Sequence, residues 1–173
     1  GAQAGDALKL VAVNEINGSN AATAEAEGLA QLYTTAAALT MKGQTITSCY
    51  FDAVQAKVNF DTTGTVTTDL TAPVQTKNEL GENYGMVAWG GAIAEWDEQA
   101  AALAAFSVGK TVEELRNGAI DENTGKAPEG SDLASSATIY LGGYVYAIEV
   151  AVSNARHLGA QSGDALKLAV IAS

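Results

Sequence analysis

The sequence predicts an α+β domain in which about three helices pack on one face of a mainly antiparallel sheet. Segments rich in small and β-branched residues come early in the chain. Helical periodicity and helix-capping signals come late. A chain of 173 residues suits one domain with its own hydrophobic core, and such a domain requires no disulfide or metal for stability.

Three strands are predicted, over residues 7–13, 28–41 and 45–53. The first is apolar almost throughout. The turn between the second and third contains Gly43, which is typical of a hairpin. Alternation along the third strand predicts that Cys49 and Phe51 lie on one face and Ile46 on the other. A smaller second hairpin is predicted over residues 58–67.

The predicted helices cover residues 92–108, a short segment after residue 111, and residues 144–157. In the first, Trp96 shares a face with Ile93 and Leu103, so we expect it to be a core residue. The second begins at a capping box. The Thr111 hydroxyl is spaced to accept the N–H of Glu114, and the Glu114 carboxylate is spaced to accept the N–H of Thr111.

Composition narrows the class of function. Nine Lys and Arg residues against twenty Asp and Glu residues give a net charge of −11. This charge disfavours binding to nucleic acids and to anionic membrane surfaces. No apolar stretch reaches the ~20 residues of a bilayer span, so we expect no membrane insertion by this segment. The chain has one cysteine, Cys49, so it cannot form an internal disulfide. Its one histidine is His157, so a Ser-His-Asp triad assembled in the usual way lacks material. We therefore predict no metal site, and no catalytic group is identifiable.

A sequence repeat links the two ends of the chain. Residues 159–168 repeat residues 1–10 with one difference, Ala4 against Ser162. The copies lie much farther apart than the ~20–50-residue period of solenoid repeats. We therefore interpret residues 1–158 as one unit of a tandem array and residues 159–173 as a duplicated boundary strand, which either begins the next unit or closes this one.

Two segments are candidates for binding a ligand or cofactor. Ser135, Ser136 and Thr138 form a hydroxyl-rich turn before the third predicted helix, where N–H groups and the helix dipole suit a phosphate. An ordinary strand start is the competing interpretation. Tyr84 and Trp89 lie in a glycine-rich segment and are a candidate platform for a planar ligand, or else they pack the start of a helix.

Residues 45–61, 76–86 and 95–100 resemble a repeated domain of surface proteins and lipoproteins of anaerobic Gram-positive bacteria. The resemblance covers most of the chain. It implies an extracellular place in the cell envelope, in a lipid-anchored parent protein, with neighbouring repeat domains as partners. The resemblance implies no established function. We interpret the domain as a non-catalytic module for display, spacing or ligand binding, with a small molecule as a further candidate partner, and we expect no cofactor.

The segment Ser135-Ser136-Ala137-Thr138 is also similar to the motif of extracellular flavin-binding domains that carry FMN esterified to a threonine. This resemblance implies an alternative function in electron transfer, with FMN as cofactor and Thr138 as its acceptor. The sequence departs from the motif at Ser136, where the family has glycine. A Cβ at that position obstructs close backbone approach, which puts the attachment in doubt.

Overall fold

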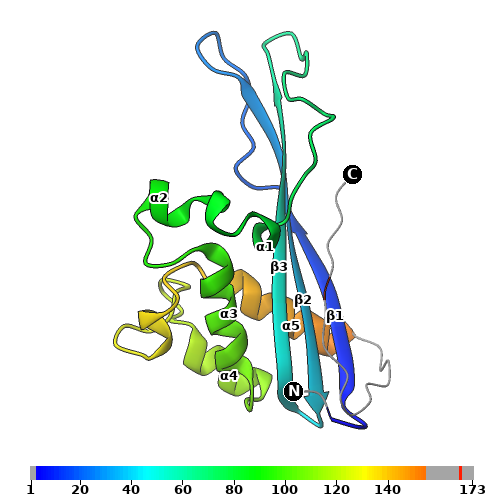
Figure 1. The fold of residues 1–173 in the computed structure, drawn as a ribbon, viewed down its shortest axis with the longest axis vertical. Coiled ribbons are helices and arrows are strands. Elements are labelled where there is room, and N and C mark those ends of the chain that lie inside the picture. Colours follow the sequence, from blue (N-terminus) through cyan, green and yellow to red (C-terminus); the bar gives the residue numbers. More distant parts are fainter. Residues whose placement is uncertain (1–2, 155–167, 169–173) are drawn as a thin grey trace.

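The structure is a computed structural model that describes residues 3–154 and residue 168 (Figure 1). Its elements in chain order are β1 (Ala7–Glu15), β2 (Gly28–Lys42), β3 (Thr45–Phe60), α1 (Lys77–Leu80), the 3₁₀-helix η1 (Gly81–Tyr84), α2 (Met86–Gly90), α3 (Trp96–Ser107), α4 (Val112–Ala119), the 3₁₀-helix η2 (Leu133–Ser135) and α5 (Gly142–Asn154). The α+β class is confirmed. The predicted number of helices is wrong, because the described part contains five α-helices. His157 and the boundary segment 159–173, apart from residue 168, lie outside the described residues.

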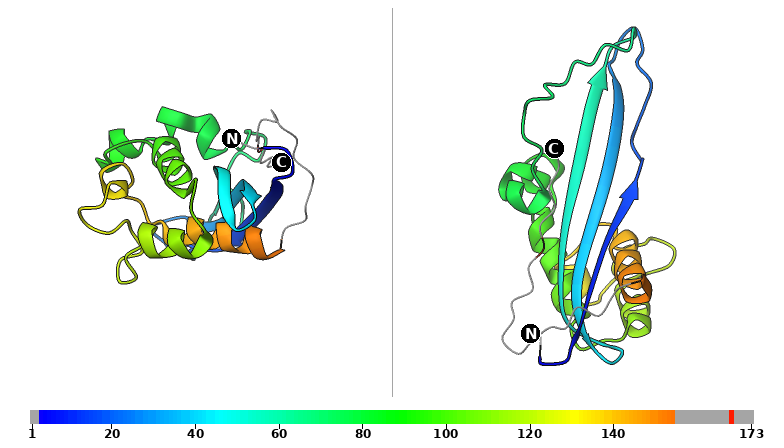
Figure 2. Two further views of the ribbon diagram at one scale, coloured as in Figure 1. Left: turned by 90° about the horizontal axis from the view of Figure 1, so that it is seen from below. Right: turned by 90° about the vertical axis from the view of Figure 1, so that its right-hand side faces the viewer.

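The three strands form one antiparallel sheet in the order β1-β2-β3. Ala7 pairs with Met41, and at the opposite end of the long hairpin Gly28 pairs with Phe60. This end of the hairpin extends beyond the helices (Figure 2). The second hairpin predicted from the sequence is only a single bridge between Phe60 and Val66, because its first arm is the end of β3.

A bulge near the turn changes which side chains of β3 face the core. Thr40 pairs with Ser48, whereas Met41 pairs with Ile46, so Thr47 is an extra residue in β3. An extra residue reverses the alternation of side chains along a strand. Ile46 therefore belongs to the same core cluster as Phe51, and the prediction that they lie on opposite faces is wrong.

The hydrophobic core lies between the sheet and helices α3, α4 and α5. Ala37, Leu39 and Met41 of β2 alternate along the strand and contribute one face of the sheet. Trp96 is 2% exposed, which confirms its prediction as a core residue. Ile93 is 56% exposed, so its predicted place on the buried face is wrong. The reason is that a capping box at Glu95 starts α3 only at Trp96.

Within the described residues, none of the helices has the length and apolar character that crossing a membrane requires. This agrees with the expectation that the segment does not insert into a bilayer. Among the described elements the longest helix is α5, with 13 residues, and its apolar side chains such as Ile148 and Ala151 are buried in the protein core. Its apolar character is therefore explained by packing against β1 and β2.

Candidate functional site

Helix α1 carries the side chain at the centre of the candidate site, Lys77. The Thr76 hydroxyl accepts the N–H of Glu79 and the Glu79 carboxylate accepts the N–H of Thr76, so a capping box starts the helix at Lys77. The side-chain amide of Asn78 donates to the Phe51 carbonyl at 2.8 Å and holds α1 against β3, as Figure 1 shows. Lys77 is only 5% exposed, which is unusual for a lysine without a charged partner.

Aromatic rings from three different elements surround the Lys77 ammonium group. Its Nζ lies 4.7 Å from the ring centroid of Tyr33 in β2, 4.4 Å from that of Tyr84 in η1, and 5.1 Å from that of Trp96 in α3. These distances are within the ~6 Å range of cation–π attraction. Lys77 forms no salt bridge with any described residue. Its charge therefore faces π-systems and hydroxyl groups instead of a carboxylate.

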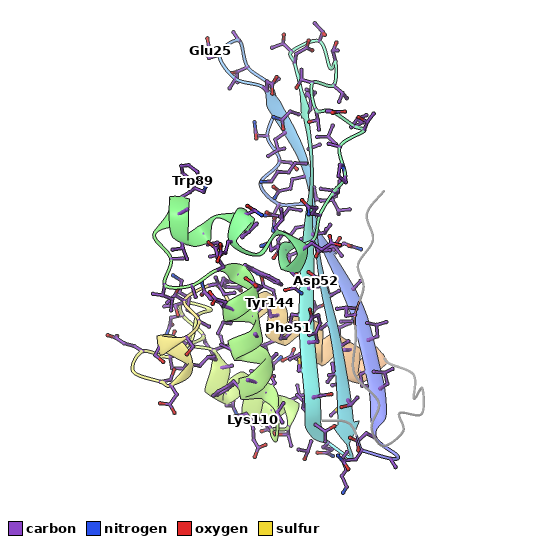
Figure 3. All side chains as sticks on the ribbon, in the orientation of Figure 1. Glu25, Phe51, Asp52, Trp89, Lys110 and Tyr144 are labelled. Carbon is purple, nitrogen blue, oxygen red and sulfur yellow. The ribbon has the colours of Figure 1, made fainter. Side chains whose placement is uncertain are left out.

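A chain of hydrogen bonds runs from Lys77 into the core. Nζ donates to the Tyr33 hydroxyl at 3.1 Å, the hydroxyls of Tyr33 and Tyr144 lie 2.8 Å apart, and Trp96 Nε1 donates to the Tyr144 hydroxyl at 2.8 Å. Figure 3 labels Tyr144 next to Phe51, and their rings meet edge to face with centroids 5.7 Å apart. An ammonium group brings three hydrogens, an indole one and each phenol one, whereas the phenol oxygens are the acceptors here. Donors therefore outnumber acceptors.

A pocket of about 350 Å³ opens beside this network. That volume is within the usual ~300–1,000 Å³ of small-molecule sites. Its wall includes Lys77, the rings of Tyr33, Tyr84, Trp96 and Tyr144, and the apolar Met86 and Ile139. Exposed Glu15 and Asn17 also line it, and the Asn17 amide donates to the Glu15 carboxylate at 2.8 Å. The pocket thus combines an apolar wall, the hydrogen-bond donors of the Lys77 network and one carboxylate, that of the exposed Glu15.

Burial determines the protonation of the network. It lowers the pKa of Lys77 to about 7, and the positive charge of Lys57 acts in the same direction. Burial also raises the pKa values of Tyr33, Tyr84 and Tyr144 above the usual phenol value, so these hydroxyls keep their protons. Near neutral pH, Lys77 therefore exists as both an ammonium group and a neutral amine.

Comparisons with known proteins give no assignment for this site. No family model, no curated protein and no solved structure matches the chain. The resemblances to surface-protein repeats and to flavin-binding domains therefore stay predictions. The geometry of the pocket is the basis for the function proposed below.

The Thr138 segment, predicted from the sequence as a phosphate site, has its donors engaged by the protein. Gln99 of α3 is fully buried, and its Oε1 accepts the N–H of Thr138 at 2.8 Å, the N–H of Ile139 at 3.2 Å and the Thr138 hydroxyl at 3.3 Å. Ser135 Oγ donates to a backbone carbonyl at 2.7 Å, and Ser136 is exposed. A phosphate at this place has to compete with Gln99.

The two predicted aromatic residues lie in different surroundings. Tyr84 is part of the Lys77 pocket, and its hydroxyl donates to Gln55 Oε1 at 3.1 Å. Trp89 is 90% exposed and projects from α2 at the surface (Figure 3). Its ring covers Gly85, where a Cβ would overlap it. Tyr84 is therefore the one predicted site residue that lines this pocket.

Cys49 and Asp121 have roles in local structure. Burial raises the pKa of the Cys49 thiol to about 12, so the thiol stays protonated and is a poor nucleophile. The Asp121 carboxylate accepts the N–H groups of Asn123 and Thr124, as expected for a turn. In residues 3–154 and 168, no group of three or more His, Cys, Asp or Glu side chains is placed to hold a metal ion.

Sequence reasoning missed Lys77, the residue on which the site is centred. The pattern Thr76-x-x-Glu79 is the same capping signal as Thr111-x-x-Glu114, so the helix start was recognisable. The burial of Lys77 was not recognisable, since it depends on rings that β2, η1 and α3 contribute from distant parts of the chain.

Proposed function

We propose that this domain is a ligand-binding module of a cell-surface repeat protein, and that the Lys77 pocket binds a small organic carboxylate. The observation that carries the proposal is the excess of donors around the pocket. A carboxylate has two oxygens with about four acceptor sites. Bound beside Lys77, it accepts from the ammonium group and from the phenol hydrogen that the Tyr33–Tyr144 pair leaves without an acceptor.

The rest of the pocket favours a ligand with an apolar or aromatic body. Trp96, Met86 and Ile139 contribute apolar surface. Gly143 and Tyr144 at the start of α5 also line the pocket, so the positive end of that helix dipole adds to the field of Lys77. The net charge of −11 acts against polyanions, which supports a ligand with a single negative charge.

The role of Asp6 supports the tandem-repeat part of the proposal. Asp6 is 1% exposed, and its carboxylate accepts the Gln3 N–H at 3.0 Å and the Thr47 hydroxyl at 2.7 Å. These hydrogen bonds lower the pKa of Asp6 and fix the start of β1 to the β3 bulge. The second copy retains the Asp6 carboxylate, as Asp164, within the same ten-residue sequence. This retention supports the proposal that the chain belongs to a tandem array in which the boundary sequence recurs.

Benzoate is a suitable probe for the pocket because it combines a carboxylate with one ring. We expect saturable binding in a ¹H–¹⁵N NMR titration at pH 6.5, weakened at least about tenfold in Lys77→Met, since charged hydrogen bonds contribute ~1.5–3 kcal/mol. Lys110→Met is the matched control, because Lys110 Nζ also lies over a ring, that of Phe106, at 4.0 Å. Absence of saturable binding, or binding unaffected by Lys77→Met, contradicts the proposal.

The binding of FMN is the alternative function. It is supported by Tyr84 in the pocket and by Ile139 and Tyr140, which follow Thr138 directly and form part of the same wall. Co-expression with a flavin transferase, followed by intact mass measurement, tests it. An FMN adduct that Thr138→Ala abolishes supports the electron carrier over the carboxylate module. We expect no adduct in the wild type, because Gln99 engages the Thr138 donors and Ser136 replaces the motif glycine.

A further inference from the structure

The geometry points to a covalent reaction in the same pocket: the ε-amine of Lys77 captures small aldehydes and ketones as a reversible imine. This inference rests on the pocket of the proposed function, and it adds carbonyl compounds as a ligand class and Lys77 as a modification site. Three observations support it. Lys77 is 5% exposed, its amine forms no salt bridge with a described residue, and its side chain lines a pocket of about 350 Å³.

Burial and the positive charge of Lys57 favour the neutral amine that such a reaction requires. Tyr33 of β2, Tyr84 of η1 and Tyr144 of α5 are uncharged, because burial raises the pKa of each phenol. The charged groups are Lys57 of β3, which lowers the pKa of Lys77, and Glu15 of β1, which is exposed and makes no salt bridge with it. Burial is the larger cause of the lowered pKa, to about 7.

The reaction needs no oxidant or reductant. The lone pair of neutral Nζ attacks the carbonyl carbon, a C–N bond forms, and the carbonyl π electrons move to oxygen. A proton then passes from nitrogen to that oxygen and gives a carbinolamine. Loss of water from the carbinolamine forms the C=N bond. Tyr33 is positioned to relay the proton, because its hydroxyl lies 3.1 Å from Nζ and 2.8 Å from the Tyr144 hydroxyl.

The lowered pKa gives a measurable selectivity. An ordinary lysine with a pKa of ~10.4 is less than ~0.1% neutral at pH 7, whereas a lysine with a pKa of about 7 is about half neutral. A less basic amine is intrinsically less nucleophilic, which offsets part of this thousand-fold difference. We expect imine formation at Lys77 to be at least about tenfold faster than at the exposed Lys57 and Lys126.

Reductive trapping tests the inference on the folded protein. Benzaldehyde and cyanoborohydride are added at pH 7, and peptide mass mapping locates the benzyl group. We expect the first adduct on Lys77, with a rate that rises between pH 6 and pH 8. Lys77→Arg keeps the positive charge but lacks a primary amine, so it loses the fast adduct. Lys126→Arg, the matched control, keeps it. Tyr33→Phe is expected to slow trapping severalfold, since it removes the proposed relay.

The outcomes separate this inference from the proposed function. Benzyl groups spread evenly over the lysines, together with Lys77-dependent benzoate binding, overturn the imine and leave the carboxylate module intact. A selective Lys77 adduct without benzoate binding supports the imine and contradicts the carboxylate as ligand. Even labelling without benzoate binding overturns both.

Discussion

The Lys77 pocket and the Thr138 segment both bring N–H and O–H groups together, and they differ in what accepts from them. At the Thr138 segment, the backbone and hydroxyl donors converge on Gln99 Oε1. At the pocket, Lys77 has Tyr33 as its one hydrogen-bond partner among the described residues. The protein itself accepts the hydrogen bonds of the Thr138 segment, whereas donors of the Lys77 pocket are left without an acceptor in the described part of the chain. Unused hydrogen-bonding capacity therefore distinguishes the two regions better than residue type does.

Two buried carboxylates, those of Glu95 and Asp52, follow the pattern of the Thr138 segment. Glu95 is 6% exposed and accepts the N–H groups of Met86 and Val87 at 2.9 and 3.0 Å. Asp52 is 5% exposed and accepts the N–H of Ala53 at 2.8 Å. Backbone donors thus compensate these buried negative charges. Among the described residues, the buried ammonium group of Lys77 has no equivalent set of acceptors, and one buried carboxylate oxygen, Asp97 Oδ1, likewise has no hydrogen-bond partner.

The largest effect is expected for the tryptophan that anchors the pocket. Trp96→Ala removes a buried ring and the donor to Tyr144, and we expect it to cost about 3–5 kcal/mol of unfolding free energy in denaturant titrations. Trp89→Ala is the matched control, with an expected change within about 0.5 kcal/mol, because Trp89 is 90% exposed. Equal losses for both tryptophans contradict the assignment of the core.

The next largest effect removes the acceptor that saturates the Thr138 segment. Gln99→Leu removes the part-buried hydrogen bonds that the N–H groups of Thr138 and Ile139 donate, and two bonds of ~0.5–1.5 kcal/mol each predict a loss of ~1–3 kcal/mol. Chemical denaturation measures the loss, and Thr138→Ala is expected to change stability by less than about 1 kcal/mol. If Gln99→Leu is as mild as Thr138→Ala, the two regions do not differ as described.

A pH-dependent effect is expected at Lys77. Its pKa of about 7 in the folded protein lies below the ~10.4 of an unfolded chain, so between these values the unfolded state binds more protons. Stability relative to Lys77→Met therefore rises with pH across this window, by at most about 1.4 kcal/mol per pH unit, and is constant below it. Parallel urea titrations of both proteins from pH 6 to pH 10 measure the difference. A constant difference contradicts the lowered pKa.

The smallest effect separates the ring of Tyr84 from its hydroxyl. Tyr84→Phe removes the hydrogen bond to Gln55 and keeps the ring near Lys77. We expect a loss of about 0.5–1.5 kcal/mol, the usual net value for a hydrogen bond. Benzoate affinity in the NMR titration should be unchanged, since that hydroxyl already donates to Gln55. A large loss of affinity indicates that the ligand contacts the hydroxyl directly.

Local patterns were sufficient to predict much of the fold. The glycine turn at Gly43 and the small residues around it predicted the β2–β3 hairpin, and the Thr111 capping box predicted the start of α4. The predictions failed where distant contacts decide the outcome. The bulge at Thr47 depends on pairing with β2, and the start of α3 depends on how the Glu95 carboxylate is used.

The site was less predictable than the fold, for a related reason. Tyr84 was a candidate because an aromatic ring in a glycine-rich segment can form a platform for a planar ligand. Lys77 resembles a surface lysine in its local sequence, and its burial depends on β2, η1 and α3 meeting around it. The Thr138 segment was a candidate because its hydroxyl-rich turn can be recognised from the local sequence. Its hydrogen-bond partner, Gln99, lies 39 residues away and could not be predicted from that local sequence.

Titration of Lys77 itself tests the central claim most directly. In protein labelled with ¹³C-lysine, the Cε resonance of Lys77, assigned by its loss in Lys77→Arg, reports the protonation of Nζ. We predict a midpoint near pH 7 in the free protein, because burial lowers the pKa to about that value. Benzoate should move the midpoint upward, since a carboxylate stabilises the ammonium form. A midpoint near the ~10.4 of an ordinary lysine, unmoved by benzoate, would contradict the account.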